Sequence, residues 1–353
     1  MDIRNLRTPA LVLDIDVYEK NAEIMKSFLT GSKMKLRPHY KSHKCTAIAH
    51  RQIGAGAKGI CCAKLGEAED LANAGIEDIL IANQITERNK VAQVAHLAKC
   101  CYLTVCVDSK ENIADLDAAA AFEGSRIHCL VEYEIGMERC GVSTEDEFYA
   151  LARQIEGCPH LIFEGVQAYA GHLSHEADYD KRKAESEKVE KRLWQLLGYM
   201  EEKGLTVREV SGVSTGTIQF RPKDTVYTEA QSGSYIFMDA AYGALNLKFE
   251  NSLFVLSTVM SRNENYVSAD AGRKSVGVDQ AMPVIRDCPD VPVDVSEEHI
   301  TVAAKKYPAV VGDRIFIIPG HCCTTVNLHD FIYFISGDKV IDRVPITSRG
   351  KSF

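Results

Sequence analysis

The stretch MKLRPHYKSHK, residues 34–44, joins a strand-like run to a helix-like run near the start of the chain. Side chains alternate along a strand, so four polar residues of this run share one face: Lys35, Arg37, His39 and Lys41. Ser42 has the chemistry of an N-cap for a helix over HKCTAIAHRQIG, and Lys44 would then lie in the first turn of that helix. The pattern therefore predicts Lys41, rather than Lys44, at the carboxyl end of a strand.

Seven more strand-like runs follow along the chain: KGICCA, DILIAN, YLTVCVD, IHCLVEYE, LIFEGVQAY, VREVSGVS and TVYTEAQ. Most of them are separated by segments with apolar spacing near 3.6, such as EAEDLANAG and EDEFYALARQIEG. Regular alternation of strands and helices indicates a parallel sheet. Eight such units over roughly 215 residues predict an α/β fold, a (β/α)8 TIM-type barrel, with an open doubly wound sheet as the structural alternative.

The pattern of apolar residues changes at about residue 248. Runs such as SLFVLSTVMSR, HITVAAKK, DRIFIIPG and FIYFISGDKVIDRVPI alternate with turn residues and show almost no helical spacing. We therefore predict a barrel over residues 14–247 and a smaller antiparallel β-domain over residues 248–353. Residues 1–13, which lead into the strand-like run TPALVLDI, are expected to pair with this β-domain.

Composition and charge narrow the class of protein. Of the 353 residues, 25% are charged and 46% are hydrophobic, and the formal net charge of −8 is spread along the sequence. Nothing in this pattern indicates a nucleic-acid partner. No apolar run approaches the roughly 20 residues of a membrane span, and the first residues lack a secretory signal, so we expect a cytoplasmic protein without a membrane partner. The twelve cysteines include three adjacent pairs and are expected to be reduced and mostly buried.

Small residues and hydroxyl groups gather at the ends of the last two predicted barrel strands. SGVSTGT ends the seventh strand, and QSGSY ends the eighth. Barrels commonly bind phosphate at these two positions, because backbone N–H groups there can approach an anion closely. Lys41 could hold an aldehyde as a Schiff base, although a lysine at a strand end can also merely pair with a carboxylate. An aldehyde and a phosphate together describe pyridoxal phosphate.

Several motifs together resemble a known family. RPHYKSHK, GMERCG after the fifth strand, STGT, SGSY and the trailing β-domain resemble the fold-type III pyridoxal-phosphate enzymes, a group that includes the alanine racemases. RPHYKSHK together with PGHCC and VNLHD is similar to the D-threonine aldolase and D-serine dehydratase family, over nearly the whole chain. The resemblance implies a small amino-acid substrate, a preference for D-amino acids and a homodimer.

The same resemblance implies roles for individual residues. Lys41 would hold the cofactor and act as the base at the substrate α-carbon, and Arg139 in GMERCG would hydrogen-bond the phenolic oxygen of the cofactor. The other implied cofactor-binding residues are Thr215, Gly216, Thr217, Gly233 and Ser234 around the phosphate, and Gln167 and Tyr169 along the ring. Gln231 takes the place of an arginine that faces the pyridine nitrogen in racemases of this fold, and a neutral residue there would leave that nitrogen less protonated.

A metal site is a separate hypothesis. In DRIFIIPGHCCTTVNLHD, an extended chain would point His321 and Cys323 the same way and Cys322 the opposite way. An imidazole and a thiolate suit zinc, although two ligands fall short of a structural zinc site and cysteine is often simply buried. The resemblance implies that His321 and Cys323 hold a divalent metal beside the cofactor, with zinc favoured and manganese or magnesium as alternatives.

The second metal ligand distinguishes two activities. Aldolases of the family resemble HxD at this place and dehydratases resemble HxC, so the sequence favours dehydration of a β-hydroxy-D-amino acid to a 2-oxo acid and ammonia. The alternative is retro-aldol cleavage to glycine and an aldehyde. A pyridoxal-phosphate carrier and a metal-free racemase are rival classes. Asp270 and Asp279, in ADAGRKSVGVD, could reach the active site, but Asp-Ala-Gly is also common in turns.

Overall fold

The computed structural model describes residues 1–353, and the chain divides into two compact units. The barrel unit comprises Phe28–Lys41, Thr46–Gly233 and Lys351–Phe353. The β unit comprises Met1–Ser27, Ser42–Cys45 and Ser234–Gly350. No helix has both the length and the apolar character needed to cross a membrane. All twelve cysteines are free thiols, and six of them, rather than most of them, are buried.

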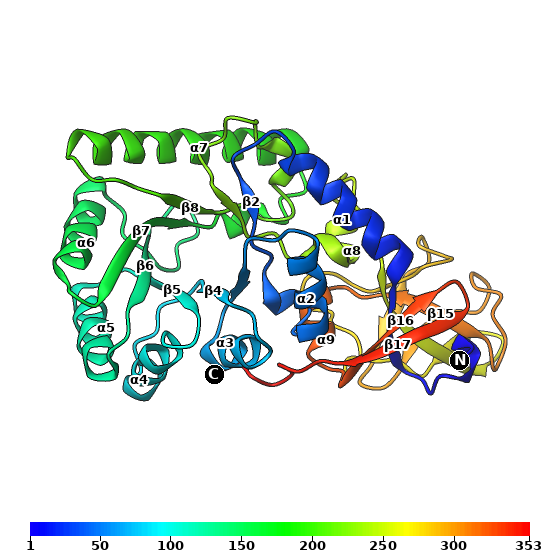
Figure 1. Cartoon of the computed structure of the whole chain (residues 1–353). Helices are drawn as coiled ribbons and strands as arrows, with labels where there is room; N and C mark the ends of the chain where they lie inside the picture. The colour runs from blue at the N-terminus through cyan, green and yellow to red at the C-terminus, as the bar shows by residue number, and fades with distance from the viewer. The chain divides into compact units, whose positions relative to one another are not determined.

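Eight parallel strands form the sheet of the barrel unit (Figure 1). In chain order they are β2 (Lys35–Leu36), β3 (Ile60–Cys62), β4 (Asp78–Ile81), β5 (Tyr102–Val107), β6 (Ile127–Glu132), β7 (Leu161–Ala168), β8 (Glu209–Gly212) and β9 (Glu229–Ala230). Each strand pairs with the next in sequence from β3 to β9, and β9 pairs with β2. A parallel bridge between His39 and Cys61 then joins the β2 and β3 ends of the sheet. The predicted TIM-type barrel is confirmed, and each of the eight predicted runs contains one strand.

Helices connect these strands and lie on the outer side of the sheet (Figure 1). Their local sequence sets where they begin and end. Ser109 precedes α5 and accepts the Asn112 amide hydrogen, and Gly124 ends α5 with a φ of +67° that suits glycine. The helices of this part of the chain are α2 (Thr46–Gly54), α3 (Leu65–Asn73), α4 (Arg88–Leu97), α5 (Lys110–Glu123), α6 (Glu145–Gly157) and α7 (Tyr179–Glu202), with the short 3-10 helices η2 (Tyr40–Ser42), η3 (Gly171–Leu173) and η4 (Ile218–Phe220).

The predicted helix start at Ser42 is wrong. Helix α2 begins only at Thr46, and Lys44 has a φ of +49°, in the left-handed region that a right-handed helix does not contain. The Cys45 amide donates to Nδ1 of His43 at 3.3 Å, and this local side-chain bond competes with helical hydrogen bonding. Lys44 therefore lies in a loop, where its main-chain oxygen accepts the Ser348 amide hydrogen at 3.0 Å.

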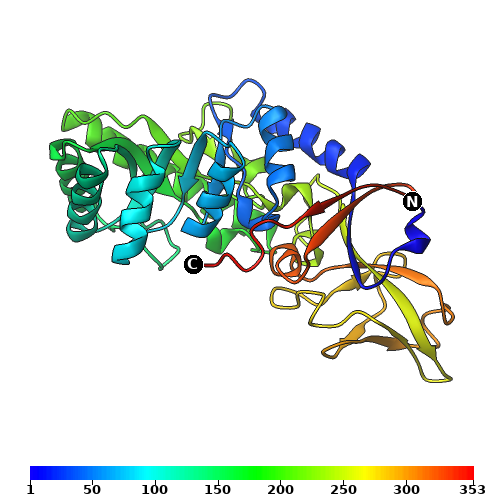
Figure 2. The ribbon, with the colours of Figure 1, turned by 60° about the horizontal axis from the view of Figure 1, so that its bottom comes forward.

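A nine-stranded, mostly antiparallel sheet forms the β unit, and strand β1 lies between β10 and β16. Figure 2 shows the blue start of the chain among the yellow to red segments of this unit. β1 pairs antiparallel with β10 and parallel with β16, so the first residues of the chain belong to this unit. Its strands are β1 (Ala10–Asp14), β10 (Leu253–Arg262), β11 (Tyr266–Ala269), β12 (Val284–Ile285), β13 (Val293–Val295), β14 (Ile300–Ala303), β15 (Arg314–Ile318), β16 (Phe331–Ser336) and β17 (Lys339–Pro345).

Short helices and an apolar cluster complete the β unit. Helix α1 (Ile15–Leu29) follows β1, and the other helical elements are η1 (Ile3–Asn5), η5 (Ser234–Ile236), α8 (Ala240–Gly243) and α9 (Cys322–Val326). One face of the sheet buries a contiguous apolar cluster made of Ile3, Leu6, Val12, Phe254, Leu256 and Ile335. This cluster joins residues from both ends of the sequence in one core, and its burial stabilises the unit through the hydrophobic effect.

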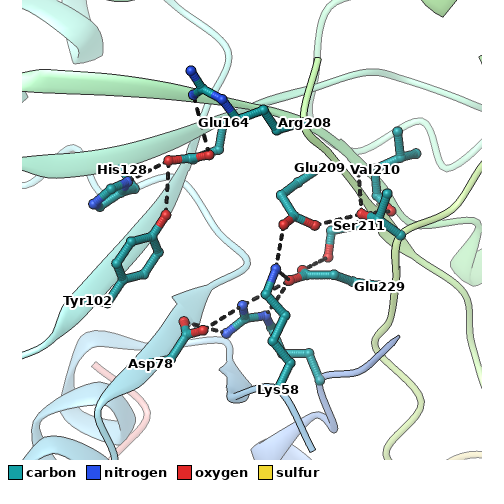
Figure 3. A network of polar contacts seen from close by, with 12 residues as sticks. Lys58, Asp78, Tyr102, His128, Glu164, Arg208, Glu209, Val210, Ser211 and Glu229 are labelled. Carbon is teal, nitrogen blue, oxygen red and sulfur yellow. Dashed lines mark hydrogen bonds and ion pairs between the residues drawn. The ribbon is translucent and has the colours of Figure 1, made fainter. Parts of the chain in front are cut away.

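The interior of the barrel is apolar in one layer and charged in the next. Cys61, Leu80, Cys106 and Leu130 form a buried cluster. Toward the amino ends of the strands, charged groups line a cavity of about 330 Å³ (Figure 3). There Arg37 Nη1 lies 2.7 Å from Asp78 Oδ1, and Arg37 Nη2 lies 2.8 Å from Glu229 Oε1. A Cβ atom at Gly59 would lie 2.4 Å from Arg37 Nη1, so glycine leaves the room that this guanidinium occupies.

These ion pairs cross the seam between β2 and β3. Arg37 follows β2, whereas its partner Asp78 begins β4 on the other side of the seam. Lys58, which precedes β3, crosses the seam in the opposite sense and lies 2.7 Å from Glu229 on β9. Burial opposes the charge of Arg37, but Glu229 and Asp78 raise the pKa of Arg37 above its ordinary value. The predicted common face of residues 35–41 applies only in part, because β2 ends at Leu36 and Lys41 lies in the 3-10 helix η2.

Replacing Arg37 by methionine should lower the free energy of unfolding by about 3–5 kcal/mol, because it leaves buried carboxylates without their main partner. Urea unfolding followed by circular dichroism measures this loss. Lys58→Met is the matched control, since the Lys58 side chain is 31% exposed and a partly exposed pair contributes only about 1 kcal/mol. Equal losses for the two variants would contradict the seam-bridging role of Arg37.

Candidate active site

A cavity of about 140 Å³ lies at the carboxyl ends of the barrel strands. This is the end at which TIM barrels carry their active sites. The residues that line the cavity end or follow several different strands: His39, Lys41, Ala63, Ala82, Asn83, Arg139, Gln167, Tyr169 and Gln231. The cavity thus brings together five residues to which the sequence assigned a role, namely Lys41, Arg139, Gln167, Tyr169 and Gln231. The larger cavity at the opposite end is a weaker candidate, because its charged groups are already paired with one another.

Lys41 lies beside an aromatic ring in this cavity. Its Nζ atom is 5.5 Å from the centroid of the Tyr169 ring, and its main-chain amide donates to His39 Nδ1 at 3.3 Å. The Tyr169 hydroxyl in turn lies 3.3 Å from Ser174 Oγ, which fixes the position of the ring. The Lys41 amine therefore lies near Tyr169, which follows β7, while His39 contacts the Lys41 main chain.

A carboxylate shapes the loop that carries Arg139. Oε1 of Glu134 accepts the main-chain amide hydrogens of Gly136, Met137 and Glu138. Gly136 and Glu138 have φ values of +114° and +51°, so the loop turns sharply around the carboxylate. Burial alone would raise the Glu134 pKa, but the three amides hold it below its ordinary value. The loop is thereby folded into one conformation with Arg139 at its end.

Arg139 is held loosely compared with Arg37. Its Nη2 atom lies 3.6 Å from Oε1 of Glu132, and 47% of its side chain is exposed. Glu132 also accepts from Gln84 Nε2 at 2.6 Å, and burial raises the Glu132 pKa although Gln84 and Arg139 oppose this shift. Arg139 thus has donors that no protein group saturates, which suits a residue that binds an anionic oxygen.

The segment Ser214–Thr217 after β8 has the features of an anion cradle. Thr215 Oγ1 is buried and has no hydrogen-bond partner. A Cβ atom at Gly216 would lie 2.2 Å from the main-chain oxygen of Ser174, so the chain can approach this closely only at glycine. The Thr217 hydroxyl accepts the Ser214 amide hydrogen at 3.3 Å and fixes the turn. An orphaned buried hydroxyl within a tight glycine turn fits the phosphate group that the sequence predicted here.

The other two predicted phosphate residues fall in different units. Gly233 is buried at the end of the barrel unit. Ser234 is the first residue of η5 and belongs to the β unit. Their assignment to the phosphate remains a prediction.

The predicted metal-binding pair lies in the β unit, but its backbone differs from the expectation. Cys322 and Cys323 are in helix α9, and His321 is its N-cap residue, so the expected strand-like alternation is wrong. Cys322 is fully buried, whereas Cys323 is only partly buried. His321 and Cys323 nevertheless remain neighbours, because their side chains hydrogen-bond to one another. The helix begins here because the Cys322 amide donates to Asp239 Oδ2 at 2.8 Å.

Asp279 orients His321. Oδ2 of Asp279 lies 2.7 Å from Nδ1 of His321, and Oδ1 accepts from Thr324 Oγ1 at 2.6 Å. Burial alone would lower the His321 pKa, but Cys323 and Asp279 together raise it to about 9. Because Asp279 holds one ring nitrogen, a metal would bind the other nitrogen in place of the hydrogen bond to Cys323, and a carboxylate on the non-ligating nitrogen is usual for histidine ligands. No group of three or more histidine, cysteine, aspartate or glutamate side chains could hold a metal, so a metal here would need water or substrate as further ligands.

Asp270 has a different role from Asp279. Its carboxylate accepts from the Thr8 and Ser257 hydroxyls and from the Thr258 amide, all within the β unit. It is therefore a structural link between the start of the chain and β10.

Sequence reasoning missed three residues in and near the cavity. Asn83 lines the cavity and donates to the Ala63 main-chain oxygen at 3.0 Å, and Gln84 donates to Glu132, the carboxylate that also lies near Arg139. Only their position in the sequence could have identified them, because every residue directly after a predicted barrel strand is a candidate for the active-site end. Residue type alone gave no reason to choose these side chains.

Comparisons with known proteins give a consistent result over the whole chain. The family model "Alanine racemase, N-terminal domain" matches residues 13–241, and the model "Putative serine dehydratase domain" matches residues 252–335. The chain is 36% identical to 3-hydroxy-D-aspartate aldolase of Paracoccus denitrificans (strain Pd 1222), over 100% of this chain and 95% of the relative. It is 28% identical to D-threo-3-hydroxyaspartate dehydratase of Delftia sp. (strain HT23), over 91% of this chain and 92% of the relative.

A solved structure supports the same relationship. The crystal structure of D-threonine aldolase from Filomicrobium marinum is 38% identical and covers 99% of this chain and 98% of its own, with a TM-score of 0.96. The arrangement of a barrel followed by a β unit is thus shared with this aldolase, and this chain is a pyridoxal-phosphate-dependent lyase. The chain belongs to the family with an alanine racemase-type N-terminal domain that includes these aldolases and dehydratases.

Replacing Glu134 by alanine should loosen the Arg139 loop. Amide hydrogen exchange at residues 136–138 should accelerate at least about tenfold, because a hydrogen bond to a charged group contributes on the order of 1.5–3 kcal/mol. Exchange followed by mass spectrometry measures this change. Glu147→Ala is the control, since Glu147 caps α6 and does not contact the loop. Unchanged protection in Glu134→Ala would show that other contacts fold the loop.

Proposed function

We propose that this chain uses pyridoxal phosphate bound at Lys41 to cleave the Cα–Cβ bond of β-hydroxy-D-amino acids. The observation that carries the proposal is the cavity that gathers Lys41, Tyr169 and Arg139 at the carboxyl end of the barrel. The Thr215 hydroxyl, buried without a partner, supports a phosphate subsite after β8. Full-length similarity to aldolases at 36% and 38% identity supports cleavage as the reaction.

The residues of the chain have distinct roles in this proposal. The Lys41 amine would hold the cofactor and, once the substrate has replaced it there, would supply one proton to the substrate α-carbon, which balances the proton that the β-hydroxyl group loses as the Cα–Cβ bond breaks. Arg139 donates to the phenolic oxygen, while Tyr169 and Gln167 border the ring. The phosphate is held by Thr215, Gly216, Thr217, Gly233 and Ser234. When bound, pyridoxal phosphate supplies a ring that withdraws the electron pair left on the α-carbon.

His321 and Cys323 are the proposed ligands of a divalent metal. Asp279 fixes the His321 ring, so one nitrogen of the ring is directed away from that carboxylate. A thiolate and an imidazole favour zinc, with manganese and magnesium as alternatives. A metal held there would act as a Lewis acid toward the β-hydroxyl group of the substrate.

Dehydration to a 2-oxo acid and ammonia is the second candidate reaction. The observation in its favour is the cysteine of the His-x-Cys pattern, because aldolases of the family resemble His-x-Asp at this place. Similarity to a dehydratase is lower, at 28% identity. The same lysine and metal ligands serve both reactions, which differ in whether the Cα–Cβ bond or the Cβ–O bond breaks.

Product analysis distinguishes the reactions. Purified protein loaded with pyridoxal phosphate and supplied with zinc or manganese is incubated with D-threonine, D-serine and D-threo-3-hydroxyaspartate. We expect glycine with acetaldehyde from the first substrate and with glyoxylate from the third, and loss of turnover after chelation. Ammonia with a 2-oxo acid would instead establish dehydration. No turnover with the cofactor still bound would favour a carrier.

The metal ligands are tested by a pair of adjacent cysteines. Cys323→Ala should lower the bound metal, measured by inductively coupled plasma mass spectrometry, whereas Cys322→Ala should retain it. Cys322 serves as the control because it is fully buried. Equal metal content in both variants would reject Cys323 as a ligand.

Lys41→Ala should abolish both the absorbance of the bound cofactor and the activity. Lys44→Ala should leave the absorbance intact, because Lys44 belongs to a different unit and lies in a left-handed loop conformation. Absorbance spectra of the dialysed proteins give the answer. The reverse pattern would overturn the assignment of Lys41.

A further inference from the structure

A chain of hydrogen bonds runs through the barrel from the charged cavity to the candidate active site. Figure 3 shows its first two members, Glu229 and Ser211. Ser211 Oγ lies 2.9 Å from Glu229 Oε2, and Gln231 Nε2 lies 2.9 Å from Ser211 Oγ. Gln231 Nε2 also lies 2.7 Å from Gln167 Oε1. All four side chains are at least 97% buried, so water does not compete for these bonds.

The charge of Glu229 determines the direction of the first bond. Burial alone would raise the Glu229 pKa, but Arg37 and Lys58 hold it below its ordinary value. An ionised carboxylate only accepts hydrogen bonds. Ser211 has a single hydroxyl hydrogen, so it donates this hydrogen to Glu229 and can only accept from its other neighbour.

The direction of the Gln231 amide follows from Ser211. Because Ser211 accepts, the Gln231 atom that faces it must be the amide nitrogen. The second hydrogen of this nitrogen goes to Gln167 Oε1. Gln231 therefore has no N–H left to donate, and its remaining polar atom is Oε1, which lies 3.3 Å from Gln167 Nε2 and keeps a free lone pair.

We propose that Glu229 is a positioning residue that, through Ser211, makes Gln231 offer only a hydrogen-bond acceptor to the cofactor cavity and so favours a protonated ring nitrogen. This inference rests on the proposed binding of pyridoxal phosphate. The phosphate and the phenolic oxygen of the cofactor are acceptors, so neither can pair with Gln231 Oε1. Apart from the nitrogen contributed by Lys41, the protonated ring nitrogen is the only donor that the cofactor has. A protonated ring is also the stronger electron sink. The inference therefore reverses the expectation from the sequence that a neutral residue at position 231 leaves the ring nitrogen less protonated, because a carbonyl oxygen accepts a hydrogen bond that only a protonated nitrogen can donate.

Glu229→Gln replaces an acceptor by a group that can donate, at the first link of this chain of hydrogen bonds. The new amide can donate to Ser211, which then becomes free to donate to Gln231. The Gln231 amide can rotate and present an N–H to the cavity, and that donor favours a neutral ring nitrogen. Glu209→Gln is the matched control, because Glu209 lines the same charged cavity and contacts Lys58 and Thr228 but not Ser211.

The test is the ¹⁵N chemical shift of ring-labelled pyridoxal phosphate bound to the wild-type protein and its variants. The wild type and Glu209→Gln should show a pyridinium shift, and Glu229→Gln should move toward the shift of neutral pyridine. Ser211→Ala interrupts the same chain without changing a charge and should also move the shift toward neutral. It serves as the second variant if Glu229→Gln does not fold.

The contrary results separate failure of the inference from failure of the proposed function. A neutral nitrogen in the wild type, or a pyridinium shift retained in both Glu229→Gln and Ser211→Ala, would overturn the inference while leaving cofactor binding intact. An equal change in Glu209→Gln would also overturn it, because the effect would then come from loss of charge in general. Absence of bound cofactor in the wild type would instead reject the proposed function on which the inference rests.

Discussion

The buried ion pairs of Arg37 are the interaction on which the barrel depends most. The sheet closes between β2 and β3 through a single bridge, so main-chain pairing is weakest at this seam. Arg37 spans the seam to Asp78 on β4 and also contacts Glu229 on β9. Because Arg37 and Glu229 are each only 3% exposed at the side chain, neither charge can be hydrated if its partner is removed. The pairing therefore specifies which strands meet at the seam.

The two arginines of the barrel show how structural and functional charges differ. Arg37 is nearly fully buried, and both of its terminal nitrogens are paired with carboxylates. Arg139 is about half exposed, and its nearest carboxylate oxygen is 3.6 Å away. The first arrangement uses up the binding capacity of the guanidinium, whereas the second leaves donors free for a ligand. The Thr215 hydroxyl, which is buried without a hydrogen-bond partner, follows β8 and so lies at the same carboxyl end of the barrel strands as Arg139.

Local sequence pattern predicted the barrel well because strand and helix periodicity repeats eight times. Chain order also predicted that Lys41 follows the first barrel strand, but the predicted alternation does not extend to it, because β2 ends at Leu36 and Lys41 lies in the 3-10 helix η2. The helix start at Ser42 and the extended form of residues 321–323 were wrong for a different reason. The His43 ring captures the Cys45 amide, and Asp239, 83 residues away in sequence, accepts the Cys322 amide. Such partners meet only in the folded chain, so the periodic pattern of apolar residues in the sequence does not predict these contacts.

Gln231 is a further case in which the sequence does not predict a contact, here the orientation of a single side-chain amide. A glutamine contains both a donor and an acceptor, and the sequence therefore does not tell which of them faces a ligand. Here the direction is decided by a charge two hydrogen bonds away, since Glu229 orients Ser211 and Ser211 orients Gln231. A neutral side chain whose oxygen faces the ring favours a protonated nitrogen, whereas the same side chain turned around favours a neutral one. The charged end of the barrel, which contributes to stability, thus also sets the hydrogen-bonding character of the end that binds the cofactor.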